Sequence, residues 1–190
     1  SLKGADSTSG ADACAGAGDS ARDGADGGSG KAAVSTADRS TGGGPPAMMP
    51  AANARAAGTV NQDDMAFWIH PTDGAMSMLI ASDRQARKLF VYDNAGRMIQ
   101  TIAAPGKPGN IDVRYDFPLG NAKTDIVAFN DRGKGKIAVY AIDAATRKIT
   151  RVDNDAIATA PANYGFCLYK SKTGKFYGFV TFEVPGKGMV

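Results

Sequence analysis

The chain has 190 residues, a length that usually corresponds to one domain, with or without a tail. Its net charge is only +3, and lysine and arginine do not alternate with aromatic residues along any stretch, so the sequence does not predict a nucleic-acid partner. No apolar run approaches the length of a membrane-spanning helix, so no membrane partner is predicted either.

The first part of the chain differs in composition from the rest. Residues 1–58 contain no aromatic side chain and hold 12 of the 24 glycines, so they cannot bury enough apolar surface to offset their chain entropy. We predict that residues 1–58 are a disordered Gly/Ala/Ser-rich leader or linker. Residues 59–190, with 17 basic and 13 acidic side chains, form the predicted folded part. That charge suits a polyanionic small ligand and equally suits a solvated basic surface.

After residue 58, short runs rich in Val, Ile, Phe and Tyr alternate with turn sequences rich in Gly, Asp, Asn and Pro. No stretch has a helical period with capping residues, so the pattern predicts an all-β meander. The predicted strands are Ala66–Ile69, Met78–Ala81, Leu89–Tyr92, Ile99–Ile102, Ile111–Tyr115, Ile126–Phe129, Ile137–Ile142, Ile149–Val152, Phe166–Tyr169 and Phe176–Phe182.

A weak repeat recurs along this part of the chain, each copy consisting of an apolar strand, a polar loop and a second strand. The copies are Leu79–Asp83 with Leu89–Asp93, Ile126–Asn130 with Ile137–Tyr140, and Gly165–Leu168 with Lys175–Phe179. Their spacing is typical of β-propeller blades, each of which is a four-stranded sheet. The alternative is a β-sandwich whose hairpins are similar by chance. Three blades do not close a ring, so the sequence predicts a partial propeller.

Two features could carry chemistry. The pair Asp63–Asp64 precedes a predicted strand, and adjacent carboxylates can bind a hard cation such as Ca²⁺, which takes six to eight oxygens. The alternative is that this pair only caps a loop. The single histidine, His70, precedes a proline at a strand end, where a structural role is the more common one.

The loops Asp83–Lys88 and Asn130–Lys136 are basic and occupy equivalent places in two repeat copies. If the copies are neighbouring blades, these loops project from the same edge and suit phosphate groups, to which Arg gives bidentate hydrogen bonds. The sequence lacks a Ser-hydrolase motif, a phosphate-binding P-loop and a zinc-ligand spacing. The basic residues concerned are Arg84, Arg87, Lys88, Arg132 and Lys134.

Three segments in this order and spacing resemble the β-propeller phytases: Asp63–Pro71, Asn110–Leu119 and Tyr164–Tyr169. The resemblance covers about residues 59–183. It implies a six-bladed propeller, of which this chain holds about three blades, and calcium-dependent removal of phosphates from phytate (myo-inositol hexakisphosphate). It implies a phosphomonoesterase of the 3-phytase type, secreted to the periplasm or the medium, in which metal-activated water attacks phosphorus directly.

The resemblance also implies roles for individual residues. Asp63 would bind the active-site calcium, Asp64 a structural calcium, and Tyr164 the calcium or the phosphate. Asp63, Tyr164 and Arg84 would form the catalytic set, because Arg84 stands where the family has the first of two phosphate-binding lysines. Arg84 would also bind substrate, together with Lys88, Arg132 and Lys134.

The sequence departs from the family at three positions where the family has phosphate-binding or other basic residues. Gln85 stands where the family has the second lysine, and Glu183 stands where it has another lysine. The family's phosphate-binding arginine is either displaced by one residue or replaced by Arg132. Such departures are typical of the divergent N-terminal propeller of two-domain members, which precedes a complete propeller. The alternative function is therefore a non-catalytic accessory module that binds calcium and inositol phosphates for an adjoining active domain.

Overall fold

The computed structural model describes residues 33–37, 48–53, 57–184 and 188–189, and the side chains of residues 57–183. Within these residues the protein is all-β, without an α-helix, and a short 3-10 turn at Gly74–Met76 is the one helical element. None of the described residues belongs to a helix that could cross a membrane. The all-β fold class and the partial propeller are thus confirmed, and each of the ten predicted strands corresponds to an observed one.

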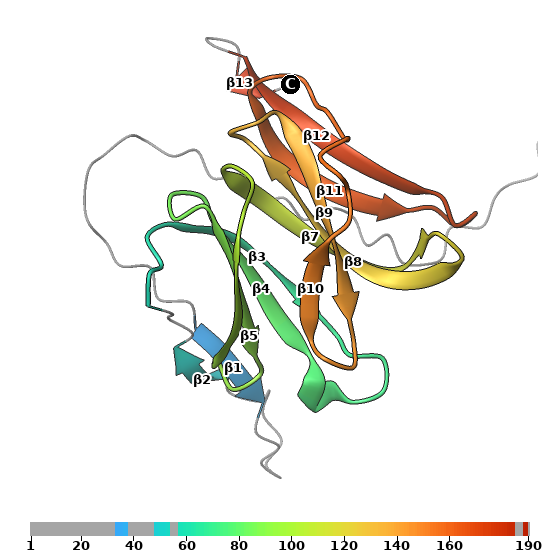
Figure 1. Cartoon of the computed structure of the whole chain (residues 1–190). Coiled ribbons are helices and arrows are strands. Elements are labelled where there is room, and N and C mark those ends of the chain that lie inside the picture. Colours follow the sequence, from blue (N-terminus) through green and yellow to red (C-terminus); the bar gives the residue numbers. More distant parts are fainter. Residues whose placement is uncertain (1–32, 38–47, 54–56, 185–187, 190) are drawn as a thin grey trace, which may run out of the picture.

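Three consecutive antiparallel meanders form the propeller part (Figure 1). The first two sheets have four strands each and the third has three. The first sheet contains β3 (Gln62–Trp68), β4 (Met78–Asp83), β5 (Lys88–Asp93) and β6 (Met98–Ala103). The second contains β7 (Pro108–Leu119), β8 (Ala122–Asp131), β9 (Lys136–Asp143) and β10 (Lys148–Arg151), and the third contains β11 (Asn163–Lys170), β12 (Phe176–Val184) and β13 (Gly188–Met189).

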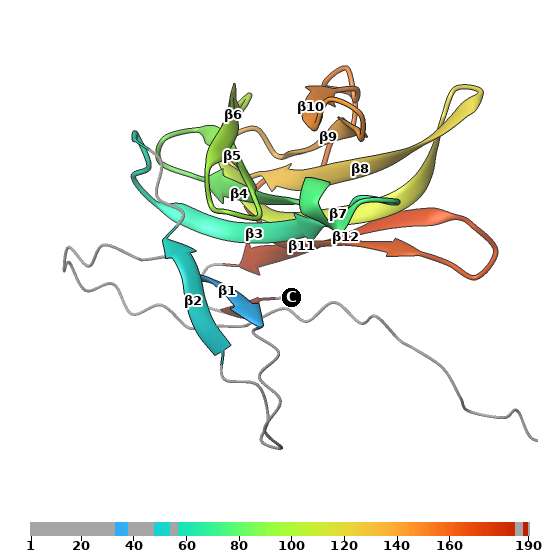
Figure 2. The same cartoon turned by 90° about the horizontal axis from the view of Figure 1, so that it is seen from below.

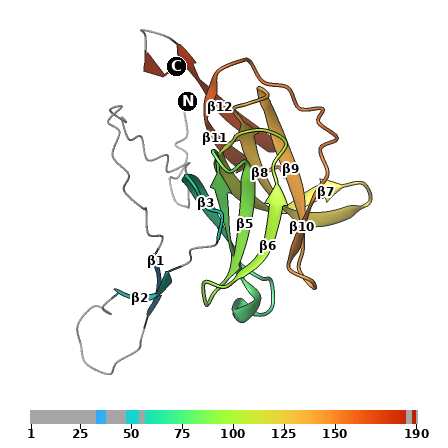
Figure 3. The ribbon, with the colours of Figure 1, turned by 60° about the vertical axis from the view of Figure 1, so that its left-hand side comes forward.

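The first strands of the three sheets, β3, β7 and β11, are the inner strands and lie side by side (Figure 2). Carboxylates link them in succession: Asp64 of β3 accepts the backbone N–H of Ile111 at 3.0 Å, and Asp112 of β7 accepts that of Leu168 at 2.8 Å. The strands β6 and β10 lie at the opposite, outer edges of the first two sheets (Figures 2 and 3). This is the blade arrangement of a propeller.

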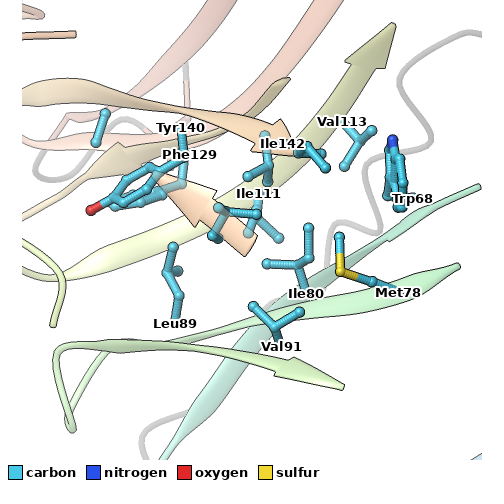
Figure 4. Close-up of a cluster of buried hydrophobic side chains, with 13 residues drawn as sticks. Trp68, Met78, Ile80, Leu89, Val91, Ile111, Val113, Phe129, Tyr140 and Ile142 are labelled. Carbon is cyan, nitrogen blue, oxygen red and sulfur yellow. The ribbon is translucent and has the colours of Figure 1, made fainter. Parts of the chain in front are cut away.

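Apolar side chains fill the spaces between neighbouring blades. Figure 4 shows Ile80, Leu89 and Val91 of the first blade facing Phe129 and other side chains of the second. A separate cluster joins the second and third blades. The Trp68 side chain is fully buried in the first interface, and its indole N–H donates to Asp125 of β8 at 2.8 Å.

The strand registers define which residues of the blades are equivalent. Asp83 pairs with Lys88 in the first blade, as Asp131 pairs with Lys136 in the second. The predicted third copy of the repeat is out of step with the first two by one strand. The first two copies are the second and third strands of their sheets, whereas β11 and β12 are the first and second strands of theirs and correspond to β3 and β4.

The segment predicted to be a leader contains a further element. β1 (Ala33–Ala37) and β2 (Met48–Asn53) form an antiparallel two-stranded sheet with an irregular register. The rest of residues 1–56 lies outside the described part of the chain. The predicted boundary between residues 58 and 59 remains a prediction.

Candidate phosphate-binding site

All three inner strands begin with a β-bulge at the same level. The register shifts lie between Gln62 and Met65 in β3, at the corresponding step of β7, and between Asn163 and Phe166 in β11. Bulges interrupt the regular alternation of a strand and can redirect a side chain. They put Asp63, Gly109 and Tyr164 at equivalent positions of the three blades.

A second set of equivalent residues faces these bulges from the ends of the second strands. The backbone N–H groups of Arg84, Arg132 and Glu183 each donate to a carbonyl just before the inner strand of the same blade, at 3.1, 2.9 and 3.0 Å. The repeated hydrogen bond shows that the three side chains start from the same edge of the propeller. We call this edge, with Asp63 and Tyr164, the mouth edge.

On the first blade, the structure brings Asp63 and Arg84 together. The Arg84 Nη2 lies 3.6 Å from the Asp63 Oδ1, with 33% and 26% of the two side chains exposed. At this distance the two side chains form an ion pair without a hydrogen bond. Two of the three predicted catalytic residues, Asp63 and Arg84, therefore share one end of the first sheet.

On the second and third blades, Arg132 lies between two neighbours. Its guanidinium carbon is 4.3 Å from the centre of the Tyr164 ring, a cation–π contact. Its Nη2 also donates to Glu183 Oε2 at 3.4 Å. A β-carbon on Gly109 would come within 3.2 Å of Arg132 Cδ and 2.7 Å of Asn130 Oδ1, so the arginine stem packs closely over the bulge of the second blade, which carries glycine.

Buried polar side chains connect the bulged inner strands of neighbouring blades. Ser82 Oγ, beside Asp83 at the end of β4, donates to the Gly109 carbonyl at 2.7 Å and accepts the N–H of Asp64 at 3.2 Å. Asn130 is fully buried, and its Nδ2 donates to the Tyr164 carbonyl at 2.7 Å. The bulges of neighbouring blades are thus held in fixed relation.

These positioning residues were missed by the sequence analysis, although a signal was present. An Asp follows Ser82 in the first blade and Asn130 in the second, in each case after an apolar strand. Both aspartates are buried and accept backbone N–H groups of their turns. The recurrence of a small polar residue followed by Asp could have identified the two loop anchors.

Asp64 does not share the position of Asp63. Its Oδ2 accepts the N–H of Ile111 and the Nδ2 of Asn110 at 3.0 and 3.2 Å, and its Oδ1 accepts the N–H of Met65 at 2.8 Å. Oδ2 therefore joins β3 to β7, and Oδ1 is engaged within β3 itself. The role of Asp64 as a calcium ligand remains a prediction.

Among the described residues, neither of the two lysines predicted to bind substrate is ion-paired with a side chain of the mouth edge. Lys134 Nζ is 4.0 Å from Asp155 Oδ2, which also accepts a hydrogen bond from Lys136 at 2.7 Å. Hydrogen bonds from Lys136 and then from Arg151 hold the pKa of Asp155 at about 2, below its ordinary value of 3.8. Lys134 therefore belongs to a network around the loop after β10.

Lys88 is half-buried at the start of β5, opposite Asp83 in the strand pairing. A β-carbon on Gly58 would lie 3.8 Å from its Nζ, so Lys88 reaches the backbone just before β3. Among the described residues, no ion pair joins it to the side chains of the mouth edge. Its role in substrate binding remains a prediction.

His70 has a local structural role. Its Nδ1 accepts the backbone N–H groups of Thr72 and Asp73 at 3.3 and 3.0 Å, which shapes the loop before the 3-10 turn. The backbone N–H of His70 donates to Ser77 Oγ. The interpretation of this lone histidine as structural agrees with the geometry.

Clustered acidic side chains do not mark a calcium site among the described residues. No group of three or more His, Cys, Asp or Glu side chains able to hold a metal occurs within the described part of the chain. Asp63 offers one carboxylate at the mouth edge, whereas calcium takes six to eight oxygens. Further ligands would have to be backbone or amide carbonyls, water or groups from other parts of the protein.

Comparison with known proteins adds to this geometry. The family model described as Phytase matches residues 35–187, so the match begins inside the segment predicted to be a leader. A 3-phytase of Bacillus subtilis (strain 168) is 42% identical over 132 residues, which cover 66% of this chain and 34% of the relative. The chain thus spans about a third of the length of this curated relative.

Proposed function

Because the chain belongs to the β-propeller phytase family, we propose that it supplies part of a site that hydrolyses phosphomonoesters of phytate, with the 3-phytase type of activity. One observation carries the proposal. Arg84 and Arg132, on adjacent blades, start from the same edge, and each lies against a residue of a bulged inner strand. Two cations so placed suit two neighbouring phosphates of one ring.

The proposed roles follow from the contacts of each side chain. Arg84 and Arg132 would each bind a phosphate through paired N–H donors and neutralise charge on its equatorial oxygens. The Tyr164 ring beneath Arg132 restrains that guanidinium, so less side-chain freedom is lost when the phosphate binds. Asp63 orients Arg84 by the ion pair between them.

We also propose that the activity depends on calcium in the assembled protein, with Asp63 as a ligand from this chain. When bound, calcium neutralises phosphate charge and lowers the pKa of the attacking water. The additional oxygens would come from backbone or amide carbonyls, water or other parts of the protein. Calcium dependence, a location outside the cytoplasm and a following complete propeller are proposals supported by the family resemblance alone.

A second function is favoured by a different observation. Both arginines of the mouth edge are paired with carboxylates, and the described residues contain no cluster of three metal ligands. This combination suits an accessory module that binds inositol phosphates without cleaving them. Binding and cleavage must therefore be measured separately.

The test measures phosphate release from phytate at neutral pH and, in parallel, phytate binding by calorimetry. Release that a chelator abolishes supports the enzymatic proposal, and binding without release supports the accessory module. Arg84→Gln should weaken binding, whereas Arg97→Gln is the matched control. Arg97 is an exposed arginine paired with Asp93 beyond the opposite end of the same sheet. If the chain binds no phytate with or without calcium, both functions are refuted.

A further inference from the structure

Glu183 occupies the third of the three equivalent positions at the mouth edge. The first two positions carry Arg84 and Arg132, and the third carries a carboxylate that reaches back to the arginine of the neighbouring blade. The two side chains are 51 residues apart in the sequence and come from β12 and the loop after β8. The carboxylate of Glu183 therefore occupies the guanidinium of Arg132, which is well placed to bind a phosphate of a ligand.

Arg132 does not depend on Glu183 for its position. Its side chain is only 21% exposed because its stem lies over Gly109 and its guanidinium over the Tyr164 ring. Among the described residues, the bond to Glu183 is the one hydrogen bond found for this guanidinium, which has five N–H donors. The arginine would keep its place if the carboxylate moved away.

The Glu183 side chain is free to leave. It is 60% exposed, and its contact with Arg132 is a single hydrogen bond of 3.4 Å. Exposed ion pairs of this kind are weak and are screened by salt. A phosphate, with more charge and paired acceptor oxygens, can therefore replace this carboxylate at the guanidinium.

We infer that Glu183 is an intramolecular competitor for Arg132, so that a second phosphate binds at the mouth edge only by displacing its carboxylate. This inference rests on the proposed phosphate binding. It makes Glu183 a specificity-determining residue, because a ligand held by Arg84 alone does not meet the competitor. A ligand that presents neighbouring phosphates to both arginines must exchange with it.

The experiment is a calorimetric titration of the full chain with phytate, for the natural sequence and for Glu183→Gln. Removing one competing charge beside the ligand should tighten binding about three- to tenfold. Asp116→Asn is the matched control, because it also removes one exposed carboxylate paired with a basic side chain, Lys170. This control should leave the affinity within about twofold.

A double-mutant cycle tests whether the effect passes through Arg132. In an Arg132→Gln background, Glu183→Gln should no longer tighten binding as it does in the natural sequence. If Glu183→Gln changes affinity no more than Asp116→Asn does, or gives the same gain without Arg132, the competitor inference is wrong while phosphate binding stands. If neither the natural chain nor Glu183→Gln binds phytate, the proposed function and the inference both fall.

Discussion

Asp64 offers the sharpest test of how the blades are joined, because two explanations of it predict different results. In the structure its carboxylate is a bridge between inner strands, whereas the family resemblance implies a ligand of a structural calcium. Asp64→Ala removes either function. The two explanations differ in whether the loss of stability requires calcium.

The magnitude can be worked out from the contacts. Hydrogen bonds to a charged group contribute about 1.5–3 kcal/mol each, and a buried N–H left without a partner costs about 1–3 kcal/mol. Ile111 is only 5% exposed, so its N–H would lose its acceptor without gaining full access to water. The side chain of Asn110 is less buried and can be rehydrated. We expect Asp64→Ala to lower the free energy of unfolding by about 2–4 kcal/mol.

Urea denaturation, followed by tryptophan fluorescence, measures this change. Trp68 is the single tryptophan, is fully buried, and lies on the same strand as Asp64. The neighbouring Asp63→Ala is the matched control, because it removes an adjacent carboxylate whose one ion pair, with Arg84, is worth less than about 1 kcal/mol. Both variants are measured in calcium and in a chelator.

The bridge explanation requires the loss in Asp64→Ala to be present in the chelator. If Asp64→Ala costs no more than Asp63→Ala there, the hydrogen bonds do not hold the blades together. If the loss appears only when calcium is added, calcium binds the native state through Asp64 and the ligand explanation is correct.

Three further predictions concern the mouth edge, a surface network and the core. Gly109→Ala puts a β-carbon 2.7 Å from the buried Asn130 Oδ1 and should cost about 1–3 kcal/mol in urea denaturation while weakening phytate binding. The pKa of Asp155 is about 2 rather than 3.8, so its carboxylate stabilises the fold above pH 4 and this stabilisation is lost as the pH falls to 2. The fall in the free energy of unfolding between pH 4 and pH 2 should therefore be smaller in Asp155→Asn than in the natural chain. Trp68→Phe leaves Asp125 without the indole N–H and should cost about 1–3 kcal/mol by thermal denaturation.

Each of these has an outcome that would contradict it. An unchanged Gly109→Ala variant would mean that the bulge has room for a side chain. Equal acid sensitivity of Asp155→Asn and the natural chain would remove the lysine and arginine network as a source of stability. A Trp68→Phe variant as stable as the natural chain would show that the bond to Asp125 contributes nothing.

Ten of the eleven described propeller strands, all but β13, could be predicted because apolar side chains pack between the blades. The beginnings of the inner strands could not. β3 starts at Gln62, β7 at Pro108 and β11 at Asn163, each three or four residues before the predicted start. Apart from Met65 and Pro108, the added residues are polar or glycine, and they pair through a bulge, so they show no regular alternation of apolar residues.

The candidate site was predictable where it depends on the repeat and not where it depends on docking between blades. The equivalence of two hairpins predicted that Arg84 and Arg132 share an edge, and the structure places both there. The ion pair of Arg132 with Glu183 requires the third blade to be placed against the second. Lys134 turns instead to Asp155, in a loop whose path the sequence pattern does not specify.

The carboxylate links between inner strands also have a direction along the chain. In each link the acceptor belongs to the earlier blade and the N–H to the later one, with sequence separations of 47 and 56 residues. Each connection therefore needs only the next blade to have been synthesised. A polypeptide emerging from the ribosome N-terminus first can dock its second blade on the first before the third exists, which shortens the time for which an unpaired sheet face meets other nascent chains.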